Sequence, residues 1–243
     1  MRALVAAELL DLWEAGTAQP TWEWTQALIR RCFPECAADA LDRMTIGERD
    51  ARLIEIREAL FGRSLSGCSV CPACGARVEM DLQTSDLRLP SGALAKEADF
   101  SSAEGRVHFR VPTVGDLEAV APARDVAGMR RALLQRCVLA VEQRGTSVDV
   151  SELSAETLNA VMGRMAECDP QADVRFQLRC PDCAQSWSEA FDIASYLWTE
   201  LDTWAQRTLQ DVHRLASAYG WREADALAIS PQRRSRYLEM INA

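Results

Sequence analysis

The sequence has no excess of positive charge. Its 27 Lys and Arg residues are outnumbered by 36 Asp and Glu residues, which gives a formal net charge of −9. Proteins that bind a nucleic-acid backbone need a basic field around the binding surface. Composition therefore argues against a general nucleic-acid binder, although it does not exclude a local basic patch.

Long apolar runs are absent as well. No segment approaches the length of a membrane span, and Met1–Val5 leads into the amphipathic segment Glu8–Trp13 instead of the unbroken apolar stretch of a signal peptide. We therefore expect a cytoplasmic protein whose nine cysteines are reduced thiols. With 243 residues, of which 48% are apolar, the chain can form one sizeable core or two small domains.

The sequence signatures of common enzymes are also missing. The chain has no phosphate-binding glycine loop, Rossmann fingerprint or nucleophile elbow. His108 lies in a strand pattern and His213 in a helical one, and neither has a nucleophile or carboxylate placed to work with it. We expect both histidines to be structural and the protein to be non-enzymatic.

Two Cys-Pro-x-Cys pairs, far apart in the chain, are the most informative feature that is present. They are Cys71–Cys74 and Cys180–Cys183. Two thiolates separated by two residues can bind one ion from a single tight turn, so two such turns supply the four sulfurs of a closed tetrahedral site. Proline stiffens each turn, and Gly75 can adopt the positive φ that such a turn often needs after its second ligand. The pattern predicts a structural Zn²⁺ bound by Cys71, Cys74, Cys180 and Cys183.

Other interpretations of these cysteines remain. The two pairs could be independent reduced thiols or redox-active pairs, but no thioredoxin-like βαβ pattern surrounds either one. Cys68 forms a further Cys-x-x-Cys pair with Cys71 and is an alternative ligand. We prefer the pair Cys71 and Cys74, because it carries the proline and the glycine and mirrors the second pair. The remaining thiols are then expected to be small core residues: Cys32, Cys36, Cys137 and Cys168.

Strand patterns surround both pairs. Arg77–Leu82 follows the first pair and the similar Trp187–Ile193 follows the second, which indicates a duplicated unit of Cys pair plus strand. Apolar residues alternate along Arg77–Leu82 and along Val107–Val111, which predicts a small antiparallel sheet beside the metal. A further strand, Val174–Leu178, leads into the second pair.

Helical patterns fill most of the remaining chain. Three helices are predicted in the N-terminal part: one over residues 3–15, one that begins near Pro20, and one that begins at Thr45, where Thr45 and Glu48 form a capping box. In the middle of the chain, one helix is predicted over residues 125–143 and another from Ser154 to just before Asp169. A long helix over residues 192–219 with Gly220 as its cap is followed by two shorter helices, the last of which begins at Ser230-Pro231. A surface loop is expected around Pro90–Gly92.

The predicted fold class is mainly α with a small antiparallel β element built around the two Cys pairs, that is, α+β. We expect an N-terminal helical region over residues 1–65 and a β region with inserted helices over residues 66–193. The C-terminal helical region, residues 194–243, is expected to fold as one cooperative unit with the zinc region.

Several stretches resemble a known protein family. They are Asp169–Ala172, Cys180–Cys183, Phe191–Ile193, Leu197–Leu201, Val212–Ala216, Tyr219–Glu223 and Ser230–Leu238. In these stretches the chain resembles baseplate-associated proteins of contractile phage tails and phage-tail-like contractile injection systems, and more distantly the T-even phage baseplate or hub-assembly family. The resemblance is strongest over residues 105–243, where Phe109–Thr113 and Gly115–Leu117 also fit.

The resemblance implies a protein–protein role in the baseplate without enzymatic activity. Its implied partners are baseplate, hub or tail proteins, and it leaves open whether the protein is a component of the assembled particle or an assembly chaperone. One residue departs from the family pattern, because the glycine that usually follows the second Cys pair is Ala184 here.

A zinc-ribbon nucleic-acid-binding regulatory protein is the alternative. It predicts basic residues around the Cys pairs, but the sequence has acidic residues there: Glu79, Asp81, Asp182, Glu189 and Asp192. A second nucleic-acid hypothesis, a helix-turn-helix near the C-terminus, depends on the arginines at 233, 234 and 236. A partner-facing helix surface that suits an acidic neighbour is the preferred interpretation of those arginines.

Overall fold

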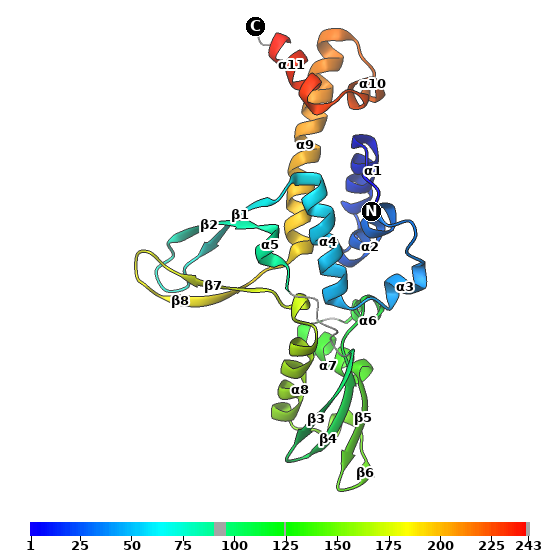
Figure 1. The fold of residues 1–243 in the computed structure, drawn as a ribbon, viewed down its shortest axis with the longest axis vertical. Coiled ribbons are helices and arrows are strands. Elements are labelled where there is room, and N and C mark those ends of the chain that lie inside the picture. Colours follow the sequence, from blue (N-terminus) through cyan, green and yellow to red (C-terminus); the bar gives the residue numbers. More distant parts are fainter. Residues whose placement is uncertain (90–95, 124, 242–243) are drawn as a thin grey trace. The chain divides into compact units, whose positions relative to one another are not determined.

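The computed structural model describes residues 1–89, 96–123 and 125–241. They form two compact units, one from Met1–Pro34 with Ile193–Ala243 and one from Glu35–Asp192 (Figure 1). Helices predominate and the strands form small antiparallel sheets, so the predicted α+β class is confirmed. The division into three regions stays a prediction, and the loop expected around Pro90–Gly92 lies outside the described residues.

The first unit is helical in its described part. It contains α1 (Ala6–Gly16), α2 (Thr21–Cys32), α9 (Ile193–Tyr219), α10 (Glu223–Ala228) and α11 (Pro231–Ile241). As predicted, α9 ends at Gly220, which has a φ of 67° and donates its N–H to the Ala216 carbonyl at 2.8 Å. Ser230 Oγ accepts from the Arg233 N–H at 3.3 Å, which caps the start of α11.

Helices α1 and α2 pack on α9 through tryptophans. The rings of Trp24 and Trp198 lie 5.2 Å apart between centroids at an interplanar angle of 52°. Gly16 permits this packing, since a Cβ there would lie 2.6 Å from the Trp198 ring. Trp13 Nε1 donates to Asp202 Oδ1 at 2.8 Å. Asp202 therefore has a structural contact that its position on the polar side of α9 did not predict.

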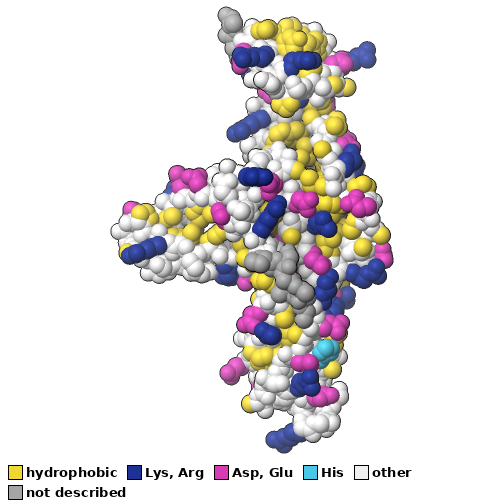
Figure 2. All heavy atoms as spheres, viewed as in Figure 1, with side chains coloured by type: hydrophobic (Ala, Val, Ile, Leu, Met, Phe, Trp, Pro, Cys, Tyr) yellow, Lys and Arg dark blue, Asp and Glu magenta, His cyan; other side chains and the backbone are white. Residues whose placement is uncertain are grey.

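The second unit combines helices with three sheets in its described part. Its helices are α3 (Ala38–Asp42), α4 (Ile46–Phe61), α5 (Thr84–Leu87), α6 (Val114–Val120), α7 (Val126–Cys137) and α8 (Ala155–Cys168), with short 3₁₀ turns at Val150–Glu152 and Pro170–Ala172. Its strands are β1 (Ser64–Val70), β2 (Arg77–Gln83), β3 (Glu97–Ser102), β4 (Gly105–Arg110), β5 (Val138–Gln143), β6 (Thr146–Ser147), β7 (Arg175–Arg179) and β8 (Ser186–Ala190). In the face shown in Figure 2, acidic and basic side chains are interspersed over the surface.

A four-stranded sheet and two helices form one hydrophobic core cluster of this unit. The strand order is β3-β4-β5-β6, and all pairs are antiparallel. Phe109 on β4 is fully buried and packs with Cys137 at the end of α7 and Val161 on α8. Full burial of side chains of this size contributes about 1.5–3 kcal/mol each.

Two sequence predictions about this region were wrong. The helix expected over residues 125–143 ends at Cys137, and Val138–Gln143 continue as β5. This segment has two β-branched residues and pairs with β4, so strand pairing outweighs the helical pattern. The predicted single sheet is also wrong, because β2 pairs with β1 whereas β4 belongs to the four-stranded sheet.

The opening of α4 agrees with its predicted capping box. The Thr45 side chain accepts from the Glu48 N–H at 3.1 Å, and Glu48 Oε2 accepts from the Thr45 N–H at 2.9 Å. Short helix α3, just before it, was not predicted. Within the described part of the chain, none of the helices has both the length and the apolar character that a membrane span requires.

Candidate metal centre

Each Cys-Pro-x-Cys pair forms the tip of a two-stranded antiparallel hairpin. Strand β1 pairs with β2 up to Val70↔Arg77, and β7 pairs with β8 up to Arg179↔Ser186, so six residues form each tip. The backbone hydrogen bonds of the two tips are equivalent. The Cys71 N–H donates to the Ala76 carbonyl and the Cys180 N–H to the Gln185 carbonyl, each at 2.8 Å. Likewise, the Gly75 N–H donates to the Cys71 carbonyl at 2.9 Å and the Ala184 N–H to the Cys180 carbonyl at 3.0 Å. The same hairpin thus occurs twice in the structure. Its first copy includes β1, a strand before the first Cys pair that was not predicted from the sequence.

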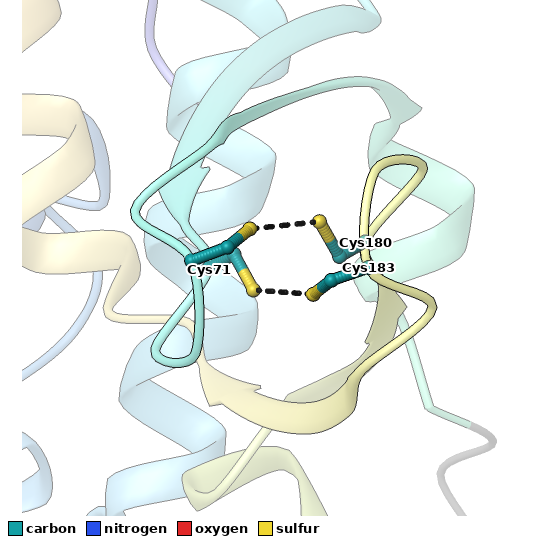
Figure 3. Close-up of side chains that lie close together, drawn as sticks. Cys71, Cys180 and Cys183 are labelled. Carbon is teal, nitrogen blue, oxygen red and sulfur yellow. Dashed lines mark hydrogen bonds between the residues drawn. The ribbon is translucent and has the colours of Figure 1, made fainter.

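The two tips face each other and bring four thiols together (Figure 3). All four Sγ atoms lie within 4.8 Å of one another, and the Cys71–Cys183 and Cys74–Cys180 distances are both 3.6 Å. A disulfide would require about 2.05 Å. Four sulfurs placed about 2.3 Å from a tetrahedral zinc lie about 3.8 Å apart. The spacing therefore fits four ligands around one ion and excludes disulfides between these pairs.

Burial differs between the two ligands of each tip. Cys71 and Cys180 are 1% and 2% exposed, whereas Cys74 and Cys183 are exposed. The first cysteine of each pair thus lies toward the protein and the second toward solvent. An ion held between them would be reachable by a chelator from one side.

The backbone and the neighbouring thiols affect thiol ionisation in opposite directions. Burial raises the pKa of Cys71, but the amides of Cys74 and Ala73 outweigh it, so that the pKa falls to about 7. The Ala76 amide lowers the pKa of Cys74, but the thiols of Cys183 and Cys180 raise it overall to about 12. Four thiols this close do not all ionise unless a cation balances them, because each thiolate raises the pKa of the next. A divalent cation would supply that balance.

A polar contact also joins the two hairpins. Ser69 Oγ on β1 donates to Glu189 Oε2 on β8 at 2.8 Å, and Trp187 Nε1 donates to the same oxygen at 3.0 Å. The Ser69 hydroxyl and the Trp187 indole lower the pKa of Glu189, since both hydrogen bonds favour its ionised form. The Ser69–Glu189 bond connects the two hairpins close to the thiols, and the Trp187 bond holds the Glu189 carboxylate within β8.

The other sequence candidates lie elsewhere. Cys68 is exposed on β1 opposite Glu79 and does not belong to the four-thiol cluster. Cys32, Cys137 and Cys168 are buried as predicted. The prediction that Cys36 is a core residue was wrong: it is only partly buried, in the loop before α3.

The two histidines do not contribute to the cluster, which contains cysteine alone. His108 on β4 is partly exposed, with Nδ1 lying 3.2 Å from Asp99 Oδ1. His213 is exposed on α9, so the expectation that it is a structural residue gains no support from its position.

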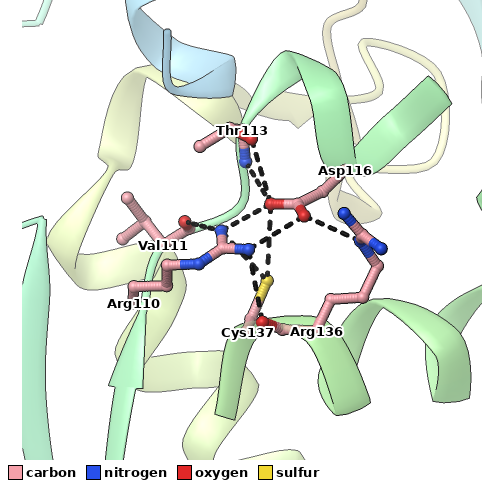
Figure 4. Close-up of polar contacts among 6 residues, drawn as sticks. All are labelled: Arg110, Val111, Thr113, Asp116, Arg136 and Cys137. Carbon is pink, nitrogen blue, oxygen red and sulfur yellow. Dashed lines mark hydrogen bonds and ion pairs between the residues drawn. The ribbon is translucent and has the colours of Figure 1, made fainter. Parts of the chain in front are cut away.

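Asp116 forms a buried ion-pair centre that the sequence analysis missed (Figure 4). Its side chain is 2% exposed, and its Oδ1 atom accepts from Arg110 Nη2 and from Arg136 Nε, each at 2.9 Å. The Thr113 N–H donates to Oδ2 at 2.9 Å. Burial raises the pKa of Asp116, but Arg110, the Thr113 amide and Arg136 hold it well below its usual range. The Thr-x-x-Asp spacing at the start of α6 was the available signal.

The Asp-Pro-Gln stretch at 169–171 also has a structural role. Asp169 Oδ2 accepts from the Gly47 N–H at 2.8 Å, so it caps the N-terminus of α4 from a distant part of the chain. The Gln171 side chain donates to the Leu87 carbonyl and accepts from the Leu89 N–H, each at 2.9 Å. One short segment thus connects α4 with the chain that follows β2.

Comparison with known proteins identifies the family. A family model described as T4 bacteriophage base plate protein matches residues 2–198. The match includes both hairpins, Asp116 and Asp169, and it extends through the N-terminal part, where the sequence resemblance was weaker. No curated protein and no solved structure matches the chain. Because the match spans most of the chain, the protein belongs to the T4 bacteriophage base plate protein family.

Proposed function

We propose that the protein is a non-enzymatic structural component of the baseplate of a contractile phage tail or of a phage-tail-like contractile injection system. The observation that carries this proposal is the family match over residues 2–198. Its partners are then other baseplate, hub or tail proteins. We favour a resident component over an assembly chaperone, because the matching family is described as a base plate protein.

The use of the buried acids supports a structural role. Asp116 is fully engaged by two arginines and a backbone amide. Asp169 is engaged by the start of α4. A catalytic acid or base must instead keep a lone pair or proton available to the substrate. Both carboxylates therefore hold secondary-structure elements together.

We further propose that the four thiols bind a structural Zn²⁺ through Cys71, Cys74, Cys180 and Cys183. A tetrahedral set of four sulfurs is typical of zinc or iron. Four protein ligands leave no open coordination position, which is the arrangement of a structural zinc site. A two-stranded hairpin is marginally stable alone. One ion shared by both tips would therefore stabilise both hairpins together.

The surroundings of the thiols favour a protein partner over nucleic acid. Glu79 and Asp81 lie on β2, and Asp182 lies in the second tip. With Glu189 on β8, these carboxylates outnumber the three arginines of the two hairpins, Arg77, Arg175 and Arg179, so the hairpins offer no basic field for phosphate. The whole chain carries a net charge of −9. The zinc-ribbon regulator therefore remains the less favoured alternative.

A nuclease-treated pull-down of the tagged protein from its native host tests the proposal. Mass spectrometry should recover baseplate, hub or tail proteins in amounts that nuclease does not change. Recovery of transcription or RNA-processing proteins alone, with capture lost after nuclease treatment, would establish the zinc-ribbon alternative. Elemental analysis of the same preparation should find one zinc per chain, and iron in its place would correct the metal assignment.

A further inference from the structure

The end of the first unit has a small core of its own, which we call the C-terminal module (residues 212–241). Val212 and Leu215 of α9 and Ala226 of α10 are buried in it. Tyr219, Trp221 and Tyr237 form an aromatic cluster around it, with ring centroids 4.9–5.8 Å apart. The module lies beyond residue 198 and therefore outside the family match.

Arg234 in this module is buried, and its Nε donor has no partner within residues 1–89, 96–123 and 125–241. The residue is 6% exposed. By contrast, the exposed Arg236 pairs with Glu239 at 2.9 Å. A buried N–H donor without an acceptor is destabilising, since its lost hydration is not replaced. The unsatisfied Nε atom makes Arg234 a candidate to bind an anionic group that another molecule supplies.

The surface of the C-terminal module has the composition of a protein interface. Tyr219 is 40% exposed and Met240 is 66% exposed, and Trp221 is only partly buried. Tyr, Trp, Met and Arg are enriched at the centres of protein interfaces. Tyr, Trp and Arg are also the residues whose replacement by alanine most often weakens binding strongly. These side chains provide apolar contact area in the same module as Arg234.

The charge of the module indicates the chemistry of its partner. Residues 212–241 contain five arginines and three acids, in a chain whose net charge is −9. In Figure 2, arginine and acidic side chains lie beside apolar side chains at the end of α9, α10 and α11. Opposite charge favours an acidic partner and disfavours a basic one. A nucleic-acid partner would be repelled by the rest of the chain.

We propose that the C-terminal module docks an acidic segment of another tail protein, with an Asp or Glu carboxylate of that segment accepting hydrogen bonds from Arg234. The inference rests on the proposed function, which supplies the class of partner. Arg–carboxylate pairs are often bidentate and are stronger than neutral hydrogen bonds. Arg234 is therefore expected to contribute more to binding than the exposed Arg236.

The test compares full-length wild type with Arg234→Met and with Arg164→Met as the control. Arg164 is an exposed arginine of α8 that pairs with Glu167. Because the Nε atom of Arg234 has no acceptor within the described part of the chain, Arg234→Met should leave the melting temperature unchanged or higher, and it should reduce the capture of tail proteins by about 10-fold or more. Arg164→Met should leave capture unchanged. A photo-crosslinking amino acid in place of Met240 should then join the protein to a peptide rich in Asp and Glu.

The outcomes separate this inference from the proposed function. If wild type and Arg234→Met capture tail proteins equally, the docking inference is wrong and the proposed function stands. The same holds if the crosslinked partner is a peptide without acidic residues or a nucleic acid. A lower melting temperature of Arg234→Met would show that Arg234 is paired within the protein, which also overturns the inference. If wild type captures no tail protein, both proposals fail.

Discussion

Replacing Cys180 by serine tests the metal site and its contribution to stability. The substitution removes one buried ligand from the four-thiol cluster and should reduce zinc from one per chain to near zero. An ion that joins Cys71 to Cys183 closes a loop of 112 residues. Closing a loop of this length restricts the unfolded chain by about 5 kcal/mol, in the same way as a disulfide. For a chain of this size the loss corresponds to a fall in melting temperature of about 10–20 °C.

The assay measures zinc by elemental analysis and melting temperature by calorimetry on the same samples. Cys68→Ser is the matched control, because Cys68 is an exposed cysteine of β1 outside the cluster. It should keep both zinc and melting temperature. If Cys180→Ser keeps full zinc and melts like wild type, the four-thiol site is not the metal site. If Cys68→Ser loses zinc, the first hairpin binds the ion through Cys68 and Cys71 instead of Cys71 and Cys74.

Three further substitutions test local features of the structure. Ala184 has a φ of 60°, which is unfavourable for a residue with a Cβ, so Ala184→Gly should raise stability by about 1 kcal/mol in calorimetry; a decrease would contradict the shared geometry of the tips. Asp116→Asn should lower the unfolding free energy in urea by about 3–5 kcal/mol at pH 7. Because the folded-state pKa of Asp116 is lowered, this difference should be complete above about pH 4 and shrink as pH falls below it; a difference independent of pH would exclude an ionised Asp116. Gly47→Ala places a methyl group against the Asp169 carboxylate and should lower the unfolding free energy by about 1–3 kcal/mol. In the control Gly163→Ala the added methyl group meets no atom within 4 Å, so the unfolding free energy should rise by about 1 kcal/mol. Equal effects of the two substitutions would refute the Asp169 cap.

Features that depend on neighbouring residues were predictable from the sequence. The Cys-Pro-x-Cys spacing fixes two thiols on one tight turn, and the duplicated strand after each pair indicated that the turns are equivalent. Gly220 ends α9, and Thr45 with Glu48 begins α4, because caps are made by residues one turn apart. The proximity of the two tips followed from metal chemistry, since one turn alone does not complete a tetrahedral site.

Features that depend on distant pairing were not predictable from the sequence. Val138–Gln143 follow α7 without a glycine or proline, and only pairing with β4 makes them a strand. Strand β1 contains three serines and a glycine, which are poor strand formers, so its pairing with β2 determines its conformation. The Asp116–Arg136 and Asp169–Gly47 contacts join residues 20 and 122 positions apart.

Mass spectrometry of purified tail particles tests the central claim most directly. Particles are prepared from a host that carries the wild-type gene and from one that carries Cys180→Ser. We expect peptides of the wild-type protein at a fixed ratio to other baseplate proteins, and a clear loss of the protein, or of particles, with Cys180→Ser. Complete, functional particles that lack the wild-type protein would contradict its assignment as a structural component of the baseplate.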